Sequence, residues 1–289
     1  MIVSGFLNIN KPPGLTSHDV VARLRRGLGI KKIGHAGTLD PLADGVLVLC
    51  LGSATRLSEY VMASVKCYRA RVRLGIITDT YDAEGRVLQE RDAAAVQRED
   101  VERVLPAFLG EIAQIPPMYS AVKQGGRKLY ELARAGQEVE RAARTVRIET
   151  LVFTDWSPPF FTLDVTCSAG TYIRSLVYDL GEVLGVGAHL AGLTRTASGV
   201  FTLEKSLTLE TLLDSTDWQR RLISPQEALA GWPSVRLDEA QLEHIRHGRA
   251  VSSSEPIAGD FAFAYGPDGS LAAAVQKDGG LWRPRKVFL

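Results

Sequence analysis

The stretch Gly34-His-Ala-Gly-Thr-Leu-Asp-Pro-Leu-Ala-Asp-Gly45 leads directly into the apolar run Val46-Leu-Val-Leu-Cys-Leu51. Its three glycines, one proline and two aspartates disfavour a helix or a central strand, so they predict a loop. The apolar run predicts a buried strand that anchors this loop. Loops held on rigid strands often carry catalytic residues, and Asp40 is a carboxylate held among turn-forming residues. A simple surface turn before a core strand is the alternative interpretation.

The composition is that of an ordinary globular protein. The chain has 289 residues, of which 45% are hydrophobic and 23% charged, and its formal net charge is +1. This length predicts one large domain and a small one, and any basic surface must be local. No apolar run approaches the ~20 residues that span a bilayer, and no signal peptide is recognisable at Met1. We therefore expect a cytoplasmic protein without membrane contact.

Metal and disulfide chemistry have little support in the sequence. Cys50, Cys67 and Cys167 lie far apart in apolar or alternating segments, which predicts reduced core residues. His244 and His247 lie one helical turn apart, but a third ligand is not nearby, so a solvated helix face explains them better. We expect no structural metal.

Two periodic segments organise the chain beyond the loop. Residues 66–76 alternate between apolar side chains and arginines, which predicts a strand with an apolar inner face. Apolar residues recur at helical spacing from Ile173 to Leu184, which predicts a helix that ends near Gly185. We also predict strands over 2–9, 146–153, 161–167, 261–265 and 271–275, and helices over 101–108 and from Thr16, Ser224 and Asp238. Strands interleaved with single helices indicate an α+β fold.

A boundary at Trp232-Pro233 predicts a large domain over 1–232 and a small β-rich domain over 233–289. The large domain contains an insertion over about 119–147. Between residues 123 and 147 it holds seven basic residues against three acidic ones. This local excess suits a polyanion such as nucleic acid.

Three segments carry candidate chemistry. They are the Asp40 loop, Tyr68 near the start of its strand, and Arg174 at the start of the 173–184 helix. A guanidinium paired with Asp40 would keep the acid ionised and oriented, as a nucleophile or proton-transfer group requires. A solvated arginine and a core tyrosine are the alternatives. Neither GxxxxGK[ST] nor GxGxxG occurs, so we expect no nucleotide cofactor.

Six ordered blocks of the sequence resemble the TruB family of bacterial tRNA pseudouridine synthases, and they span most of residues 5–200. The blocks are residues 10–14, 34–43, 66–68, 78–85, 117–123 and 170–176. The resemblance implies a pseudouridine synthase fold, with a mixed, mainly antiparallel sheet flanked by helices, and a PUA-like C-terminal module. It also implies isomerisation of uridine 55 in the tRNA T-loop without a cofactor.

The resemblance further implies roles for individual residues. Asp40 would be the catalytic nucleophile, Tyr68 would stack on the base near C5, and Arg174 would pair with Asp40. His35 would insert into the space that the flipped base vacates. Further pocket positions are matched by Lys11, Asp82, Tyr172 and Leu193. The chemical order stays open, because the carboxylate could attack the sugar, attack the base, or take a sugar proton.

RNA contacts are also expected from this resemblance. The basic insertion would clamp the T-arm at the tRNA elbow, and the C-terminal module would hold the acceptor end. The candidate RNA-binding residues of the insertion are Lys123, Arg127, Lys128, Arg141 and Arg144. We expect a monomer that requires no protein partner.

Two alternative functions remain open. One is an RNA-binding or tRNA-folding protein whose pocket is incidental. The other is a guide-RNA-dependent pseudouridine synthase, against which the basic insertion argues, because those relatives lack it.

Overall fold

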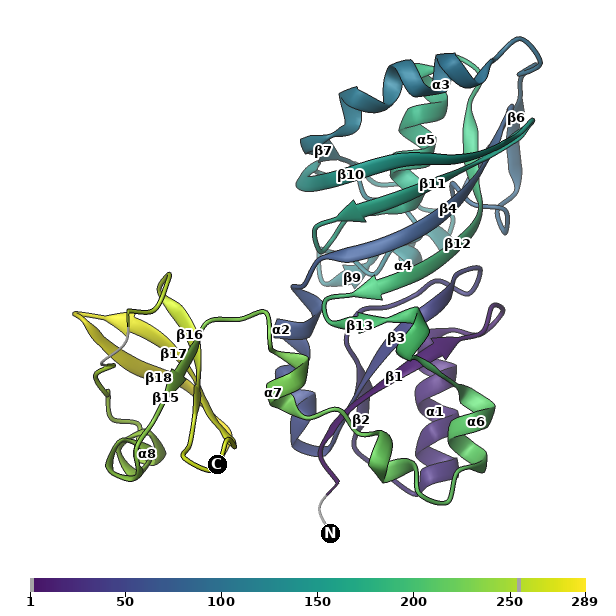
Figure 1. Ribbon diagram of the computed structural model, residues 1–289. Helices are drawn as coiled ribbons and strands as arrows, with labels where there is room; N and C mark the ends of the chain where they lie inside the picture. Colours follow the sequence, from purple (N-terminus) through teal and green to yellow (C-terminus); the bar gives the residue numbers. More distant parts are fainter. Residues whose placement is uncertain (1–2, 254–255) are drawn as a thin grey trace.

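The computed structural model describes residues 3–253 and 256–289 and contains a large mixed sheet, a smaller sheet and short helices (Figure 1). The large sheet has ten strands in the order β14-β1-β3-β12-β4-β11-β10-β7, with β13 paired to β12 and β2 to β3. Its strands are β1 (Gly5–Lys11), β2 (Ile33–His35), β3 (Asp44–Leu51), β4 (Lys66–Leu74), β7 (Gly110–Gln114), β10 (Arg144–Ser157), β11 (Phe160–Cys167), β12 (Ala188–Ser198), β13 (Phe201–Thr202) and β14 (Leu207–Thr208). Pairing is antiparallel except for β1 with β14 and β12 with β3. The predicted α+β class is confirmed.

Two groups of helices pack on the two halves of this sheet (Figure 1). The helices are α1 (Ser17–Leu28), α2 (Ser58–Met62), α3 (Arg98–Val104), α4 (Leu129–Arg134), α5 (Ile173–Val183), α6 (Leu209–Asp214), α7 (Pro225–Ala228) and α8 (Glu239–Arg246). Helices α1 and α6 share a core with β1 and β3, whereas α5 and α3 share one with β4, β10, β11 and β12. Helix α1 begins where predicted, because Thr16 and Asp19 form a reciprocal capping box.

Strand β3 explains why the run after the Asp40 loop is apolar throughout. Leu47, Leu49 and Leu51 pack toward α1, while the alternate residues Val46 and Val48 pack into a second core on the opposite face. A strand buried on both faces needs apolar side chains at every position. The loop that precedes β3 is therefore attached to one of the most buried strands of the protein.

Several predicted boundaries were wrong for identifiable reasons. The strand predicted over 66–76 ends at Leu74, because Gly75 adopts φ +85° and a separate strand β5 (Ile76–Thr78) then pairs with β6 (Val87–Glu90). The helix predicted over 101–108 is α3 followed by a 3₁₀ turn that contains Pro106. The strand predicted over 2–9 runs over Gly5–Lys11, and residue 2 lies outside the described residues.

The C-terminal part forms a four-stranded sheet in the order β15-β16-β17-β18. Its strands are β15 (Ser234–Arg236), β16 (Phe261–Tyr265), β17 (Leu271–Asp278) and β18 (Leu281–Val287). This module docks on α2, where the Tyr60 ring stacks on Phe261 at 5.5 Å between centroids. Lys286 Nζ also pairs with a carboxylate oxygen of Glu59 at 2.8 Å. Helix α2 therefore joins the two parts of the molecule.

Two absences hold for residues 3–253 and 256–289. Among them there is no helix long and apolar enough to cross a membrane. The same residues contain no group of three or more His, Cys, Asp or Glu side chains placed to hold a metal ion.

Candidate active site

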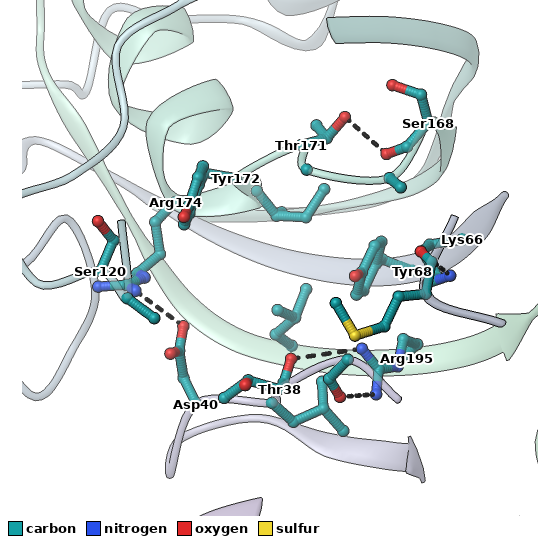
Figure 2. A pocket seen from close by; sticks show the side chains of 18 of the residues that line it. Thr38, Asp40, Lys66, Tyr68, Ser120, Ser168, Thr171, Tyr172, Arg174 and Arg195 are labelled. Carbon is teal, nitrogen blue, oxygen red and sulfur yellow. Dashed lines mark hydrogen bonds and ion pairs between the residues drawn. The ribbon is translucent and has the colours of Figure 1, made fainter. Parts of the chain in front are cut away.

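The Asp40 loop forms one wall of a cavity of about 520 Å³ (Figure 2), which lies beside the central strands β12 and β4 of the large sheet. The other walls come from α2, the start of β4, Ser120 and Ala121, the turn before α5, and β12. Of the predicted site residues, the lining includes Asp40, Tyr68, Tyr172, Arg174 and Leu193. Segments far apart in the sequence therefore meet at one pocket that is large enough for a nucleoside.

Asp40 and Arg174 form the predicted ion pair, with 3.0 Å between Asp40 Oδ2 and Arg174 Nη2 (Figure 2). The Asp40 side chain keeps 40% of its surface exposed toward the cavity, whereas that of Arg174 keeps 6%. The carboxylate is thus reachable from the pocket while its partner is buried behind it.

Further contacts fix the Arg174 guanidinium from the side away from the cavity. Its Nη2 donates to the Tyr119 carbonyl at 2.8 Å, and its Nη1 donates to the Thr80 carbonyl at 3.2 Å. Asp82 Oδ2 lies 3.6 Å from Nη1. Because these acceptors fix the plane of the guanidinium group, the Nη2 of Arg174 is held pointing toward Asp40.

Several opposing influences act on the pKa of Asp40 in addition to the ion pair with Arg174. Burial raises the pKa of the Asp40 carboxyl above its ordinary value, and the negative charge of Asp82 raises it further. Arg174 and Lys11 oppose this rise in pKa. Arg174 is therefore the largest favourable influence on the ionised form, acting against an unfavourable environment.

Tyr68 lies on β4 and lines the cavity beside Arg195. Burial raises the pKa of the Tyr68 phenol, which keeps the hydroxyl protonated at neutral pH. The ring can stack on a base, and the neutral hydroxyl is a poor proton acceptor.

Arg195 is a site residue to which the sequence patterns assigned no role. Its fully buried guanidinium donates to three backbone carbonyls, those of Val46 at 2.7 Å, Gly37 at 3.0 Å and Thr38 at 3.4 Å. It thereby ties β12 to the Asp40 loop (Figure 2). The sequence did contain a signal for Arg195. It lies two residues after Leu193, a predicted pocket residue, in the Leu-x-Arg segment at 193–195.

Lys11 and Asp82 lie behind the cavity lining, where Lys11 contacts the Asp40 loop and Asp82 contacts Arg174. Lys11 is fully buried, and its Nζ donates to the carbonyls of Pro12 at 2.9 Å and Leu15 at 2.7 Å. It also reaches the Pro41 carbonyl at 3.5 Å, next to Asp40. Burial lowers the pKa of Lys11. Its contribution is to hold the loop and to place a positive charge near Asp40.

His35 contacts helix α1, and Tyr172 is held by strand β7. His35 ends β2, lies outside the cavity lining, and has its ring 6.2 Å from that of His18. Burial lowers the pKa of His35, which favours the neutral imidazole. The Tyr172 backbone N–H donates to Gln114 Oε1 at 2.7 Å, at the start of α5. These contacts fix the chain around the cavity on both sides.

The basic insertion over residues 119–147 is called the basic segment. It forms a short hairpin of β8 (Lys123–Gln124) and β9 (Arg127–Lys128) followed by α4. Lys123, Arg127 and Arg144 are exposed, and Lys128 is half-buried with its Nζ over the Tyr130 ring. Arg141 is different, because only 15% of its side chain is exposed and it donates to the Pro116 carbonyl. Arg141 therefore also anchors the base of the segment through its bond to the Pro116 carbonyl.

Family models cover nearly the whole chain. Residues 25–173 match the N-terminal domain of TruB family pseudouridylate synthases, and 174–230 match the C-terminal domain of tRNA pseudouridylate synthase B. Residues 232–289 match the C-terminal part of tRNA pseudouridine synthase II. The chain belongs to the TruB family of pseudouridylate synthases. The predicted family and enzyme class are confirmed.

Individual TruB relatives agree with these matches. The tRNA pseudouridine synthase B of Symbiobacterium thermophilum is 51% identical over 86% of this chain and 83% of its own. That of Heliobacterium modesticaldum is 46% identical over 99% and 96% of the two chains. Among solved structures, a chain of a Cbf5-Nop10-Gar1 complex is 29% identical with a TM-score of 0.79, covering 100% of this chain and 86% of that chain.

Proposed function

We propose that this TruB protein isomerises uridine 55 in the T-loop of tRNA to pseudouridine, with Asp40 as its catalytic carboxylate. The observation that carries the proposal is the Asp40–Arg174 pair, which presents one oriented carboxylate to a nucleoside-sized cavity with an aromatic ring at Tyr68. The substrate class is supported by the bacterial relatives, which are named for tRNA.

The reaction needs no external reactant. The N1–C1′ bond breaks, the base rotates within the pocket, a C5–C1′ bond forms, the C5 proton leaves, and N1 gains a proton. A single carboxylate that adds and then departs suffices for covalent catalysis, as does one that removes a sugar proton. Arg174 keeps Asp40 charged and aimed, and Tyr68 stacks on the base. Because the Tyr68 phenol is protonated, a water molecule is the better acceptor of the C5 proton.

The uridine must leave its stack to reach Asp40, at a cost of a few kcal/mol. His35 fills the vacated space in the T-loop, where a neutral imidazole can stack and form hydrogen bonds. Exposed cations of the basic segment contact T-arm phosphates, and the C-terminal module, which we take to be PUA-like, holds the acceptor end. We expect the protein to act as a cytoplasmic monomer.

The guide-RNA alternative is less well supported. The chain is 43–51% identical to bacterial enzymes named for tRNA, and 27–29% identical to chains of H/ACA and Cbf5 complexes. Its basic segment also supplies RNA-binding charge within the chain itself. We therefore expect activity on free tRNA without guide or partner.

The deciding experiment is pseudouridine mapping of an unmodified tRNA transcript incubated with purified wild-type protein or the Asp40→Asn variant. We expect conversion at the single T-loop uridine, and a rate reduced by roughly a thousandfold or more in the variant. Transcript affinity should be equal for both proteins. A transcript with cytidine 55 is the matched negative substrate. Equal binding without conversion by either protein would favour the RNA-binding alternative, and conversion that appears only with guide RNA would favour the other.

A further inference from the structure

Helix α5 holds the turn of residues 79–85 at two points that lie one helical turn apart. Arg174 Nη1 donates to the Thr80 carbonyl at 3.2 Å. Tyr178, four residues further along α5, stacks its ring on Tyr81 with 4.0 Å between centroids and 21° between planes. Residues four apart share a helix face, so one face of α5 contacts two consecutive residues of this turn.

Tyr81 has an unusual backbone conformation. Its φ is +64°, and it is the single non-glycine residue with positive φ among residues 3–253 and 256–289. A left-handed conformation is disfavoured for an aromatic residue, so neighbouring contacts must maintain it. Two backbone hydrogen bonds contribute, from Tyr81 N–H to the Thr78 carbonyl at 3.2 Å and from Leu190 N–H to the Tyr81 carbonyl at 3.0 Å. The stack on Tyr178 fixes the side chain.

The left-handed turn brings the residues on both sides of Tyr81 to Arg174. Thr80 presents its carbonyl oxygen, and its hydroxyl donates to Asp82 Oδ1 at 2.6 Å. The Glu84 N–H donates to the same Oδ1 at 3.1 Å. With Oδ1 occupied, Asp82 turns Oδ2 toward Arg174 Nη1. Two of the acceptors that orient the guanidinium thus depend on the conformation of this turn.

From this geometry we propose that Tyr178 is a positioning residue for the isomerisation. By stacking on Tyr81, it maintains the turn that orients Arg174, and Arg174 in turn orients and charges Asp40. Both tyrosines lie outside the cavity lining, so the effect passes through Arg174 and not through substrate contact. This inference rests on the proposed catalytic role of Asp40.

The test compares Tyr178→Ala and Tyr178→Phe with the wild-type protein. Single-turnover rates of pseudouridine formation, tRNA affinity and thermal unfolding are measured for each. We expect Tyr178→Ala to slow the reaction by about tenfold to a hundredfold at unchanged tRNA affinity, since a small misplacement near the reacting groups has effects of this size. Tyr178→Phe keeps the stacked ring and should stay within about twofold of wild type.

A pH profile separates this positioning role from general destabilisation. The charged groups that face Asp40 are Arg174 from α5, Lys11 from β1, and Asp82 and Glu84 from the turn. If Tyr178→Ala displaces Arg174, the ionised form of Asp40 loses its main support. The acid limb of the rate should then move to higher pH. Leu184→Ala, which trims a half-buried side chain packed on the core at the end of the same helix, is the control and should leave this limb in place.

Tyr178→Leu keeps an apolar side chain without a flat ring and guards against a Tyr178→Ala protein that does not fold. It should reproduce the slow rate and the shifted limb. The proposal fails if Tyr178→Ala and Tyr178→Leu react at the wild-type rate, if Tyr178→Phe is as slow as they are, or if Leu184→Ala shifts the limb equally. Failure of the proposed function looks different, because the wild-type protein would then not convert the transcript at all, or Asp40→Asn would remain active.

Discussion

The Asp40 loop and the basic segment are both irregular in structure, but they are held in opposite ways. Buried side chains from three distant elements bind the backbone of the loop, namely Lys11, Ser17 and Arg195. The basic segment has a small core of its own around Leu129 and Leu132, and most of its cations are exposed. Reacting atoms require fixed geometry, whereas phosphate charge is recognised by side chains that adjust to the RNA surface.

The largest expected effect concerns Arg174→Gln, which removes the cation between Asp40 and Asp82. We expect the single-turnover rate to fall about a hundredfold or more, with tRNA affinity unchanged, because the damage is confined to the fixed region. Arg69→Gln breaks an exposed pair with Asp164 on the neighbouring strand and should leave the rate unaltered. Weaker tRNA binding at an undiminished rate would contradict the separation of the two regions.

Arg195→Met should lower the free energy of unfolding by about 2–4 kcal/mol, because three backbone carbonyls would be left without their buried donor. Arg134→Met, in the basic segment, removes an exposed cation over the Tyr130 ring and should change stability by less than about 0.5 kcal/mol. Urea titrations of both variants measure the contrast. Equal destabilisation would mean that the basic segment is as firmly integrated as the loop.

Charge reversal in the basic segment should act on binding alone. We expect the double variant Lys128→Glu and Arg144→Glu to bind tRNA about tenfold more weakly, at an unchanged single-turnover rate with saturating protein. The slope of log affinity against log salt should flatten by about 0.7–0.9 for each phosphate that the variant no longer neutralises. Arg103→Glu on α3, outside the segment, is the control and reverses one charge instead of two. An unaltered slope would show that the segment does not touch RNA.

The smallest effect at neutral pH is expected from the titration of Asp40, which should change the reaction rate and not the tRNA affinity. The pKa of Asp40 is raised, and its ionised form is the competent one, so the rate should fall as pH drops through a value above the ordinary ~3.9 of an aspartate. Single-turnover rates across roughly pH 4–9 test this expectation. Affinity measured in parallel should not follow the same limb, because the acid limb lies far below the ordinary pKa values of arginine and lysine.

Sequence periodicity predicted the elements that carry simple patterns. The apolar run of β3 and the helical stripe of α5 were recognisable because burial imposes a regular spacing on their side chains. Strand β12 was missed, although it lies at the centre of the sheet. Its pairing with β4 shifts register after Leu190 and after Arg195. These irregularities interrupt the two-residue alternation of inward and outward side chains by which a strand is recognised in a sequence.

The candidate site likewise contains residues that the sequence could identify and contacts that it could not. Asp40, Tyr68 and Arg174 were identified by residue type and family resemblance, and the Asp40–Arg174 pair is confirmed as a contact. The inward turn of Arg141 and the support from Lys11 were not visible, because they depend on which backbone carbonyls a folded chain brings near each cation. A local sequence window does not contain that information.

Helix α2 has a consequence for how the two parts of the molecule can be exchanged. Its Met62 lines the cavity, its Tyr60 contacts the C-terminal module, and its Glu59 does both. A substitution on this short helix therefore has to satisfy two neighbours at once. A chimera that joins this catalytic part to another module must supply its own counterparts of Phe261 and Lys286. Without them, helix α2, which lines the cavity, loses its contacts on the side of the C-terminal module.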